Sequence, residues 1–227
     1  MDREDVVGAS AWHLDGHALR KQHFRDRMLD AAEELILEKG DASFSTRDLA
    51  KRAGVSQATP FNHFGSKMGV LDALIERSLA EIAFATRVTS EDPLDRMFEA
   101  VDPVIRYYSR RVSLYRPVFA VVLGHDSAGP ALVRAISHWR KSLLFAQRSG
   151  LIQEGRDLDA IAEQLEANWL GTALSWIQYS LSHEQWRDVA RYNLALTLCG
   201  VVTDNARARA MKEVRRLEES MGRRRPR

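Results

Sequence analysis

The stretch STRDLAKRAGVSQATPFNHFGSK, residues 45–67, has the pattern of two short helices joined by a tight turn and followed directly by a third. Ser45 is a favoured N-cap residue, and Gly54 can adopt the left-handed conformation that ends a helix without steric cost. Ser56 is the expected N-cap of a second helix, residues 57–63. A helix, a glycine turn and a second helix with a polar start predict a helix-turn-helix, whose second helix would enter the DNA major groove.

An amphipathic helix is expected immediately before this stretch, over about residues 25–39. Its apolar side chains recur at spacings of three and four, and Gly40 would end it. The members of this apolar stripe are Met28, Ala31, Ala32, Leu35 and Ile36. The helix would support the two that follow, so that residues 23–67 form a small three-helix DNA-binding domain.

Composition limits the remaining possibilities. The chain has 227 residues, 45% of them hydrophobic, with a net charge of +2, so any basic surface for nucleic acid must be local. No run of about 18 apolar residues exists, which predicts no membrane span. The first residues lack the order of a signal peptide, and a single cysteine, Cys199, excludes an internal disulfide. We therefore expect a cytoplasmic protein, associated with the bacterial nucleoid.

Residues 68–219 read as a larger helical domain, since valine and isoleucine are scattered without strand alternation. A long helix over residues 68–89 would join it to the DNA-binding domain. Further helices are expected over residues 93–110 with a kink at Pro103, 113–123 interrupted by Pro117, 131–148, 159–181 and 185–218. The fold class is therefore all-α, with a mobile arm over residues 1–22 and a basic tail over residues 220–227.

Helix 159–181 is apolar around most of its circumference, which indicates more than one packing partner. Ala167, Gly171 and Ser175 form a stripe of small residues that would let another helix approach closely. One face can serve the domain core and another a second subunit. For the basic tail, simple solvation and non-specific phosphate contact both stay open.

The segment LDAAEELILEKGDASFSTRDLAKRAGVSQATPFNHFGSK, residues 29–67, resembles the DNA-binding domain of the TetR (tetracycline repressor) family. The similarity rests on AAEELILEKG, STRDLA, AGVS and FNHFGSK in this order, and it covers about a fifth of the chain. The resemblance implies a repressor rather than an enzyme. It also implies a second domain that binds a small hydrophobic or aromatic effector, and a homodimer formed by the last two long helices of each subunit.

The expected DNA contacts combine chemistry with this resemblance. The Gln57 amide can donate and accept together, which suits adenine N6 and N7, and Asn62 is a second candidate base reader. Thr46 lies at a helix N-terminus that can hold a phosphate. His63 and Lys67 match family positions that touch backbone phosphate. The full predicted set is Thr46, Arg47, Ser56, Gln57, Ala58, Thr59, Phe61, Asn62, His63 and Lys67.

Two residues depart from the family pattern. Most members carry tyrosine at Phe61, so the hydroxyl contact to phosphate is missing here. Most also carry leucine where Pro60 stands. Counted from Ser56 as cap, Pro60 would be the fourth helical residue, so that one early backbone hydrogen bond is lost and the recognition helix is slightly irregular.

Two polar clusters lie near the start of the chain, one cationic and one of histidines, and neither has an assigned function. The cationic residues Arg20, Lys21, Arg25 and Arg27 could form a solvated face or could touch phosphate or the minor groove. The histidines His13, His17 and His23 could suggest a metal site. Nothing supplies the remaining ligands, so solvated histidines are expected and no metal is predicted.

The second half carries no catalytic signature: it lacks a nucleophile motif, a phosphate-cradling glycine loop, HExxH and CxxC. No enzyme activity and no cofactor are predicted. Aromatic and polar side chains on its helices could enclose an apolar ligand. The predicted ligand site comprises Tyr107, Tyr108, Phe119, His138, Trp139, Asn168, Thr172 and Trp176. In the alternative interpretation the core is filled and a protein partner controls the regulator. A cavity of several hundred Å³ lined by these residues would support the ligand-binding interpretation, and its absence would support control by a protein partner.

The expected mechanism follows from two-fold symmetry. A dimer presents two recognition helices ~34–36 Å apart and reads a palindrome. A ligand that prefers another helix spacing would lower operator affinity through its differential binding to the two states, typically by ~1–3 kcal/mol. The helix that begins at Lys67 belongs to both domains and is the natural lever. Unchanged half-site spacing with and without ligand would contradict this hypothesis.

Overall fold

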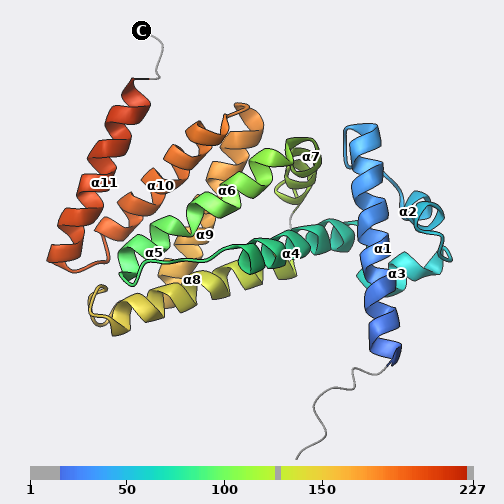
Figure 1. The fold of residues 1–227 in the computed structure, drawn as a ribbon, viewed down its shortest axis with the longest axis horizontal. Coiled ribbons are helices and arrows are strands. Elements are labelled where there is room, and N and C mark those ends of the chain that lie inside the picture. Colours follow the sequence, from blue (N-terminus) through green and yellow to red (C-terminus); the bar gives the residue numbers. More distant parts are fainter. Residues whose placement is uncertain (1–15, 126–128, 224–227) are drawn as a thin grey trace, which may run out of the picture.

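The computed structural model of the chain describes residues 16–125 and 129–223, and it is helical throughout these ranges apart from turns and short segments (Figure 1). One isolated antiparallel bridge joins Ile152 and Val202. The all-α prediction is therefore confirmed. The helices are α1 (Gly16–Lys39), α2 (Thr46–Ala53), α3 (Ala58–Phe64), α4 (Lys67–Ala85), α5 (Pro93–Glu99), α6 (Val101–Arg110), α7 (Val112–Val122), α8 (Pro130–Arg148), α9 (Leu158–Gln178), α10 (His183–Cys199) and α11 (Asp204–Gly222).

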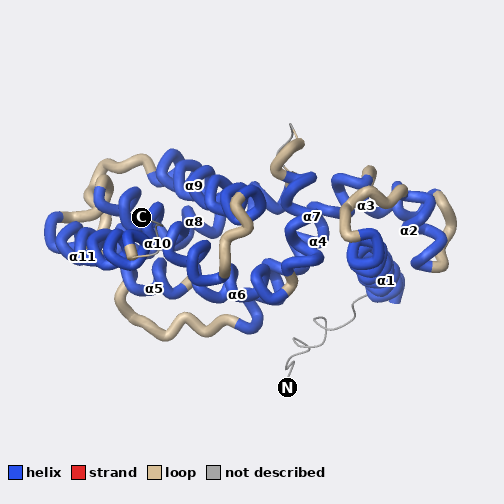
Figure 2. The backbone as a smooth tube through the Cα atoms, turned by 90° about the horizontal axis from the view of Figure 1, so that it is seen from above, coloured by secondary structure: helices blue, strands red, loops and turns tan. Residues whose placement is uncertain are grey.

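Helices α1, α2 and α3 gather at one end of the elongated molecule, and α4 runs from them into the larger group of helices (Figures 1 and 2). Met28, Ile36, Phe44 and Leu49 are fully buried between these helices and the start of α4, because their apolar side chains fall on the inward faces. This arrangement is the expected helix-turn-helix unit attached to a larger helical part.

The larger part is built around a cluster of stacked aromatic rings. The rings of Trp176 on α9 and Trp186 on α10 are stacked at a centroid distance of 4.4 Å. Tyr108 on α6 meets Phe119 on α7 edge to face at 5.0 Å. Such ring pairs stabilise a core beyond the burial of their area. Four helices, α6, α7, α9 and α10, are thus held together by aromatic contacts.

The chain departs from the expected helix 185–218, which consists of two helices instead of one. After Cys199 the backbone turns, and Thr203 N donates to Leu151 O at 2.9 Å. Val202 is completely buried at this point. The segment that follows α8 therefore pairs with the turn and replaces the helical hydrogen bonds, and α11 folds back onto α10.

The two prolines that were expected to distort helices act differently. The break in segment 93–110 falls at Ala100, between α5 and α6, and not at Pro103 itself. A proline ring excludes the carbonyl four residues earlier and lacks an N–H, so the interruption lies upstream. Helix α7 continues through Pro117, so the predicted interruption there is wrong.

Several helix ends also differ from expectation. Helix α1 begins at Gly16 rather than near Arg25, so the end of the predicted arm is helical, while residues 1–15 lie outside the described residues. Helix α4 ends at Ala85 instead of residue 89, and Thr86 takes an extended conformation. The basic tail is described only to Arg223. The exact domain boundaries stay predictions.

Candidate nucleic-acid interface

The turn between α2 and α3 is fixed by a complete set of local hydrogen bonds. Ser45 Oγ accepts from Asp48 N at 3.0 Å, and the Asp48 carboxylate accepts from Ser45 N at 3.0 Å, which is a capping box. Gly54 ends α2 with φ of 64°, in the left-handed region that favours glycine. The predicted start and end of this helix are confirmed.

The start of the recognition helix lies one residue later than predicted. Helix α3 begins at Ala58, and Ser56 is not its N-cap. Instead, Thr59 N donates to Ser56 O at 3.0 Å, and the two side-chain hydroxyls lie 2.8 Å apart. These two contacts close a turn immediately before the helix, so Ser56 stabilises the backbone turn that leads into α3.

Pro60 is the third residue of α3 and is buried against the helix-turn-helix core. Backbone N–H groups in the first turn of a helix have no acceptor within the helix. The proline consequently removes no helical hydrogen bond, which corrects the expectation that one bond would be lost. Pro60 therefore does not make the backbone hydrogen bonding of α3 irregular, contrary to the prediction.

One face of α3 is open to solvent and carries the predicted base-reading side chains. Gln57, Ala58, Phe61 and Asn62 are all exposed, and the Phe61 ring is 67% exposed. Their spacing of one, four and five positions places them on one side of a helix. Thr59 is half-buried beside them. The face offers amide groups and an aromatic ring without competing intramolecular hydrogen bonds among the described residues.

The predicted phosphate contacts surround this face. Arg47 is exposed and Thr46 half-buried at the first turn of α2, where free backbone N–H groups can hold an anion. Lys67 is the first residue of α4, and its Nζ lies 5.4 Å from the centroid of the Phe44 ring. Packing on the ring orders the lysine side chain, which lowers the entropy that a phosphate contact must overcome.

His63, at the end of α3, has a perturbed protonation equilibrium. Burial lowers the pKa of its imidazole, and the nearby charges of Lys21 and Arg25 lower this pKa further. Both effects favour the neutral form of the ring. An adjacent phosphate would favour the protonated form, so DNA contact at this residue would be accompanied by proton uptake.

The cationic cluster on α1 is engaged in the fold. Arg25 donates to the Glu76 carboxylate at 3.2 Å and lies 4.9 Å from the centroid of the Phe64 ring. Arg27 Nη2 donates to Ala53 O at 2.6 Å, at the C-terminal end of α2. These two arginines stabilise the helix-turn-helix. Their contacts therefore favour neither a simple solvated face nor a contact with phosphate or the minor groove.

The other sequence candidates of this region give no site. Lys21 and His23 are exposed. The side chains of Arg20, His13 and His17 lie outside the described residues. In the parts of the chain that the structure describes, no group of three or more histidine, cysteine or acidic residues could hold a metal.

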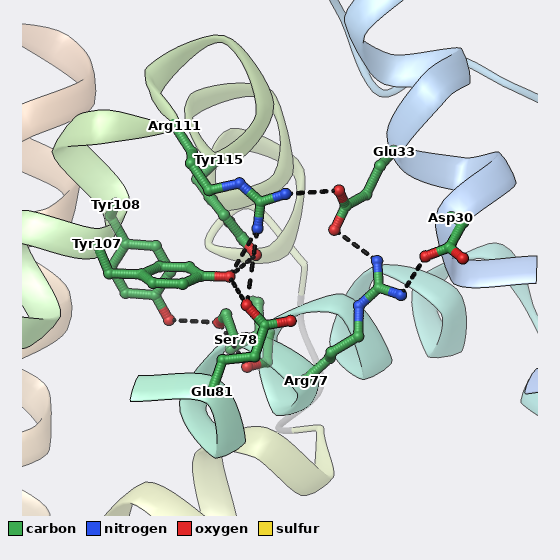
Figure 3. Close-up of polar contacts among 10 residues, drawn as sticks. Asp30, Glu33, Arg77, Ser78, Glu81, Tyr107, Tyr108, Arg111 and Tyr115 are labelled. Atoms are coloured by element: carbon green, nitrogen blue, oxygen red, sulfur yellow. Dashed lines mark hydrogen bonds and ion pairs between the residues drawn. The ribbon is translucent and has the colours of Figure 1, made fainter. Parts of the chain in front are cut away.

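A polar network that sequence reasoning missed connects α1 to the larger part (Figure 3). Arg77 on α4 bridges Asp30 at 2.6 Å and Glu33 at 2.5 Å, both on α1. The other oxygen of Glu33 accepts from Arg111, between α6 and α7, at 2.8 Å. Arg111 also donates to the Tyr107 hydroxyl at 2.7 Å, and that hydroxyl donates to Glu81 at 2.6 Å. The residues that interact lie up to 78 positions apart in the sequence, so no local sequence pattern predicts these contacts.

A second contact joins α4 to the start of α8. The carboxylate of Asp72 accepts from Ala131 N at 3.4 Å. A Cβ added to Gly129 would lie 2.3 Å from Asp72 Oδ1, so any larger residue there would require the Asp72 carboxylate to shift. Burial raises the pKa of Asp72. The two parts of the molecule therefore touch through α4 and through the direct contact of Glu33 on α1 with Arg111.

The eight predicted ligand residues do not line one cavity. Trp139, Asn168 and Thr172 line a pocket of about 20 Å³, which is room for about one water. Tyr107 lines a separate, larger cleft. His138 is exposed. The remaining three, Tyr108, Phe119 and Trp176, are buried in the aromatic core. A ligand site among these residues stays a prediction, and the interior is filled in this conformation.

The fold and this interface define the class: a helix-turn-helix protein with a helical second domain. The sequence profile of "Bacterial regulatory proteins, tetR family" matches residues 28–74. The regulator YvkB of Bacillus subtilis is 41% identical over 51 residues, which is 22% of this chain and 27% of YvkB. EthR of Mycobacterium tuberculosis is 28% identical over 154 residues, covering 65% of this chain and 68% of EthR.

Solved structures agree in fold. SmeT, the repressor of the Stenotrophomonas maltophilia multidrug efflux pump SmeDEF, superposes with a TM-score of 0.60 at 23% identity, over 82% of this chain and 94% of SmeT. TylP of Streptomyces fradiae, a TetR regulator, gives a TM-score of 0.60 at 20% identity, over 89% and 99%.

The chain therefore resembles bacterial regulatory proteins of the tetR family in residues 28–74, and it shares the fold of solved TetR regulators. It spans 27% of the length of YvkB and 46% of the length of a second mycobacterial relative, Rv1255c. The relatives are transcriptional regulators and not enzymes, in agreement with the sequence prediction. In the described parts of the chain, no helix combines the length and apolar character needed to cross a membrane.

Proposed function

We propose that this protein is a DNA-binding transcriptional regulator that binds a palindromic operator as a homodimer. The observation that carries the proposal is the exposed face of α3, where Gln57, Phe61 and Asn62 are open to solvent beside Arg47 and Lys67. Amide side chains read base edges, and the flanking cations supply phosphate affinity. Its place of action would be the bacterial cytoplasm, at the nucleoid.

The experiment that tests this function is the selection of bound sequences from random duplex DNA with the full chain. We expect a palindromic motif with half-sites about one helical turn apart, because two recognition helices related by a dimer axis read equivalent major grooves. An Asn62→Ala variant should lose preference at particular base pairs, whereas Gln147→Ala, on α8, should keep the motif. Recovery of no enriched motif with the unaltered protein would overturn the proposal.

We infer further that the regulator is a repressor released by a small effector. SmeT, which shares the fold, is a repressor and has been captured in a SmeT–triclosan complex, so this architecture accommodates small molecules. Helix α4 supports the mechanism, since it contacts α1 and α3 of the helix-turn-helix and also α6, α7 and α8 of the larger part. Release of the selected duplex by compounds from a chemical screen is the expected result.

The filled interior favours a second candidate, in which a protein partner controls the regulator. Tyr108, Phe119 and Trp176 occupy the space that an apolar effector would need. If no compound releases the selected duplex while DNA binding itself is intact, control by a protein partner becomes the better explanation.

A further inference from the structure

A cleft of about 670 Å³ lies between the C-terminal end of α4, residues 86–89 and α6. Part of its wall is apolar, formed by Ile82, Ala85 and Pro103. Its charged lining consists of five arginines and two carboxylates: Arg87, Arg106, Arg110, Arg111 and Arg191, with Glu99 and Asp102. The cleft is thus strongly cationic, although the whole chain has a net charge of only +2.

The arginines differ in how their charge is balanced. Arg191 lies 3.5 Å from Asp102 and 2.9 Å from Glu213, so its charge is compensated. Arg111 is paired with Glu33. In the described part of the chain, Arg87, Arg106 and Arg110 have no ion-pair partner. Three uncompensated positive charges therefore share one concave surface.

The spacing on α6 concentrates this charge. Arg106 and Arg110 are one helical turn apart, on the face that also carries Pro103 and Tyr107. Like charges at this spacing destabilise a helix unless a counterion lies between them. Guanidinium groups bind carboxylate and phosphate through paired hydrogen bonds. The arrangement fits an anion with several charged groups and a small apolar body against the opposite wall.

We propose that this arginine cleft, lined by Arg87, Arg106, Arg110 and Arg111, binds a small organic anion with two or more carboxylate or phosphate groups. Its role as the effector site rests on the proposed function; the binding itself does not. The site differs from the aromatic set expected from the sequence and shares only Tyr107 with it.

The cleft is connected to the helix-turn-helix through the polar network. Tyr107 and Arg111 line the cleft, and Arg111 also donates to Glu33 on α1. A bound anion would compete with Glu33 for the Arg111 guanidinium and would weaken the bond that fixes α1 against the junction of α6 and α7. Binding would thereby change the position of the DNA-binding helices.

The binding step is tested by calorimetric titration of the full chain, without DNA, with citrate and with inorganic pyrophosphate as probes. We expect saturable binding of at least one probe, and weaker binding by about 10-fold or more in the double variant R106Q/R110Q. The matched control is K212Q/R215Q, which also removes two positive charges, on the exposed face of α11, and should bind like wild type. Circular dichroism checks that both variants are folded.

Two outcomes would overturn the site: no saturable binding of either probe up to about 10 mM, or equal weakening in both double variants. Binding of citrate alone would assign the site to carboxylates, and binding of pyrophosphate alone to phosphates. Either result supports the cleft as an anion site.

The regulatory step is tested separately with the selected duplex, at constant ionic strength adjusted with potassium chloride. We expect the bound anion to lower DNA affinity in wild type and in K212Q/R215Q, but not in R106Q/R110Q. Anion binding without any change in DNA affinity would overturn the effector role. Failure to bind any duplex would overturn the proposed function and would leave the calorimetric result for the cleft intact.

Discussion

At the scale of single residues, the chemistry of α3 depends on side chains that the fold leaves unused. Gln57 and Asn62 are exposed, and so is the ring of Phe61 between them in the sequence. Lys67 is positioned on the Phe44 ring instead of in open solvent. Residues that read bases and residues that hold phosphate should respond differently to substitution.

For the DNA contacts, Gln57→Ala should relax preference at particular base pairs, by about 1–3 kcal/mol for the preferred base, because the bidentate amide contact is lost. Lys67→Ala should weaken binding to all sequences and reduce the slope of log affinity against log salt by about one. Fluorescence anisotropy with the selected duplex, at several salt concentrations, measures both effects. Identical behaviour of the two variants would contradict the assignment.

A buried carboxyl in the larger part makes a prediction about pH. Burial raises the pKa of Glu166 from its ordinary value of 4.5 to about 7, and donation from Trp139 Nε1 at 2.9 Å opposes this increase in part. The folded protein keeps the proton up to about pH 7, whereas the unfolded chain loses it near pH 4.5. The contribution of this group to stability therefore falls as pH rises between these values, by about 3 kcal/mol.

Glu166→Gln should remove this part of the pH dependence and should be more stable than wild type at pH 8, since an amide can still accept the indole hydrogen bond. Urea unfolding at a series of pH values measures the difference. Glu163→Gln, an exposed position on the same helix, serves as control and should follow wild type. An unchanged pH profile in Glu166→Gln would show that the carboxyl is already ionised in the fold.

At the scale of elements, local patterns and long-range contacts differ in how well the sequence reveals them. The N-cap Ser45 and the left-handed Gly54 involve neighbours within a few residues, and the sequence predicts both correctly, whereas the return contact from Asp48 that completes the capping box was not predicted. The start of α3 differs by one residue because Ser56 and Gln57 are both acceptable before a helix, and only the hydroxyl pair with Thr59 decides.

Contacts across the chain could not be predicted in this way. Residues 151–153 pair with the turn after Cys199, and the sequence around Val202 contains no sign of that partner. The network of Arg77, Glu33 and Arg111 likewise depends on the packing of α1 against α4 and α7. The helix-turn-helix face was therefore predictable, whereas the cationic cleft and its connection to α1 were not.

The junction of α3 and α4 provides a test at this scale. A Cβ added to Gly69 would lie 2.0 Å from Phe64 O, so Gly69→Ala must displace α3 from α4. We expect a loss of stability of about 2–3 kcal/mol and weaker DNA binding. Gly200→Ala is the control, because its Cβ would make an ordinary contact of 3.5 Å and should have an effect near zero or slightly stabilising. Chemical unfolding of both variants measures the contrast.

At the scale of the whole molecule, α9 and α10 carry exposed leucine side chains that no other described part of the chain covers. Leu174 is 42% exposed and Leu196 45% exposed. Gly171 is exposed on the same helix as Leu174, with open space around it. Two copies joined through this surface would place two recognition helices on one duplex, as the proposed function requires.

Leu174→Glu should convert the proposed dimer to monomers, with a loss of about 2 kcal/mol or more in association, because it buries a charge in an apolar interface. Analytical ultracentrifugation measures the association state. Val133→Glu, at a position that is 62% exposed on α8, introduces the same charge elsewhere and should leave the dimer intact. A monomeric wild type, or a Leu174→Glu variant that still dimerises, would place the interface on another surface.

The stacked indoles described in the aromatic core have an optical consequence. The four described tryptophans, Trp139, Trp169, Trp176 and Trp186, all belong to α8, α9 and α10, and helices α2 and α3 contain none. Because the rings of Trp176 and Trp186 are only 4.4 Å apart, their transitions couple and should produce a split near-ultraviolet dichroism band when the transition dipoles are skewed within the stacked planes. The fifth tryptophan, Trp12, lies outside the described residues, so in a Trp12→Phe variant the emission excited at the red edge of tryptophan absorption will come only from α8, α9 and α10. A labelled duplex and the intrinsic fluorescence can therefore follow the two ends of the protein independently in one cuvette.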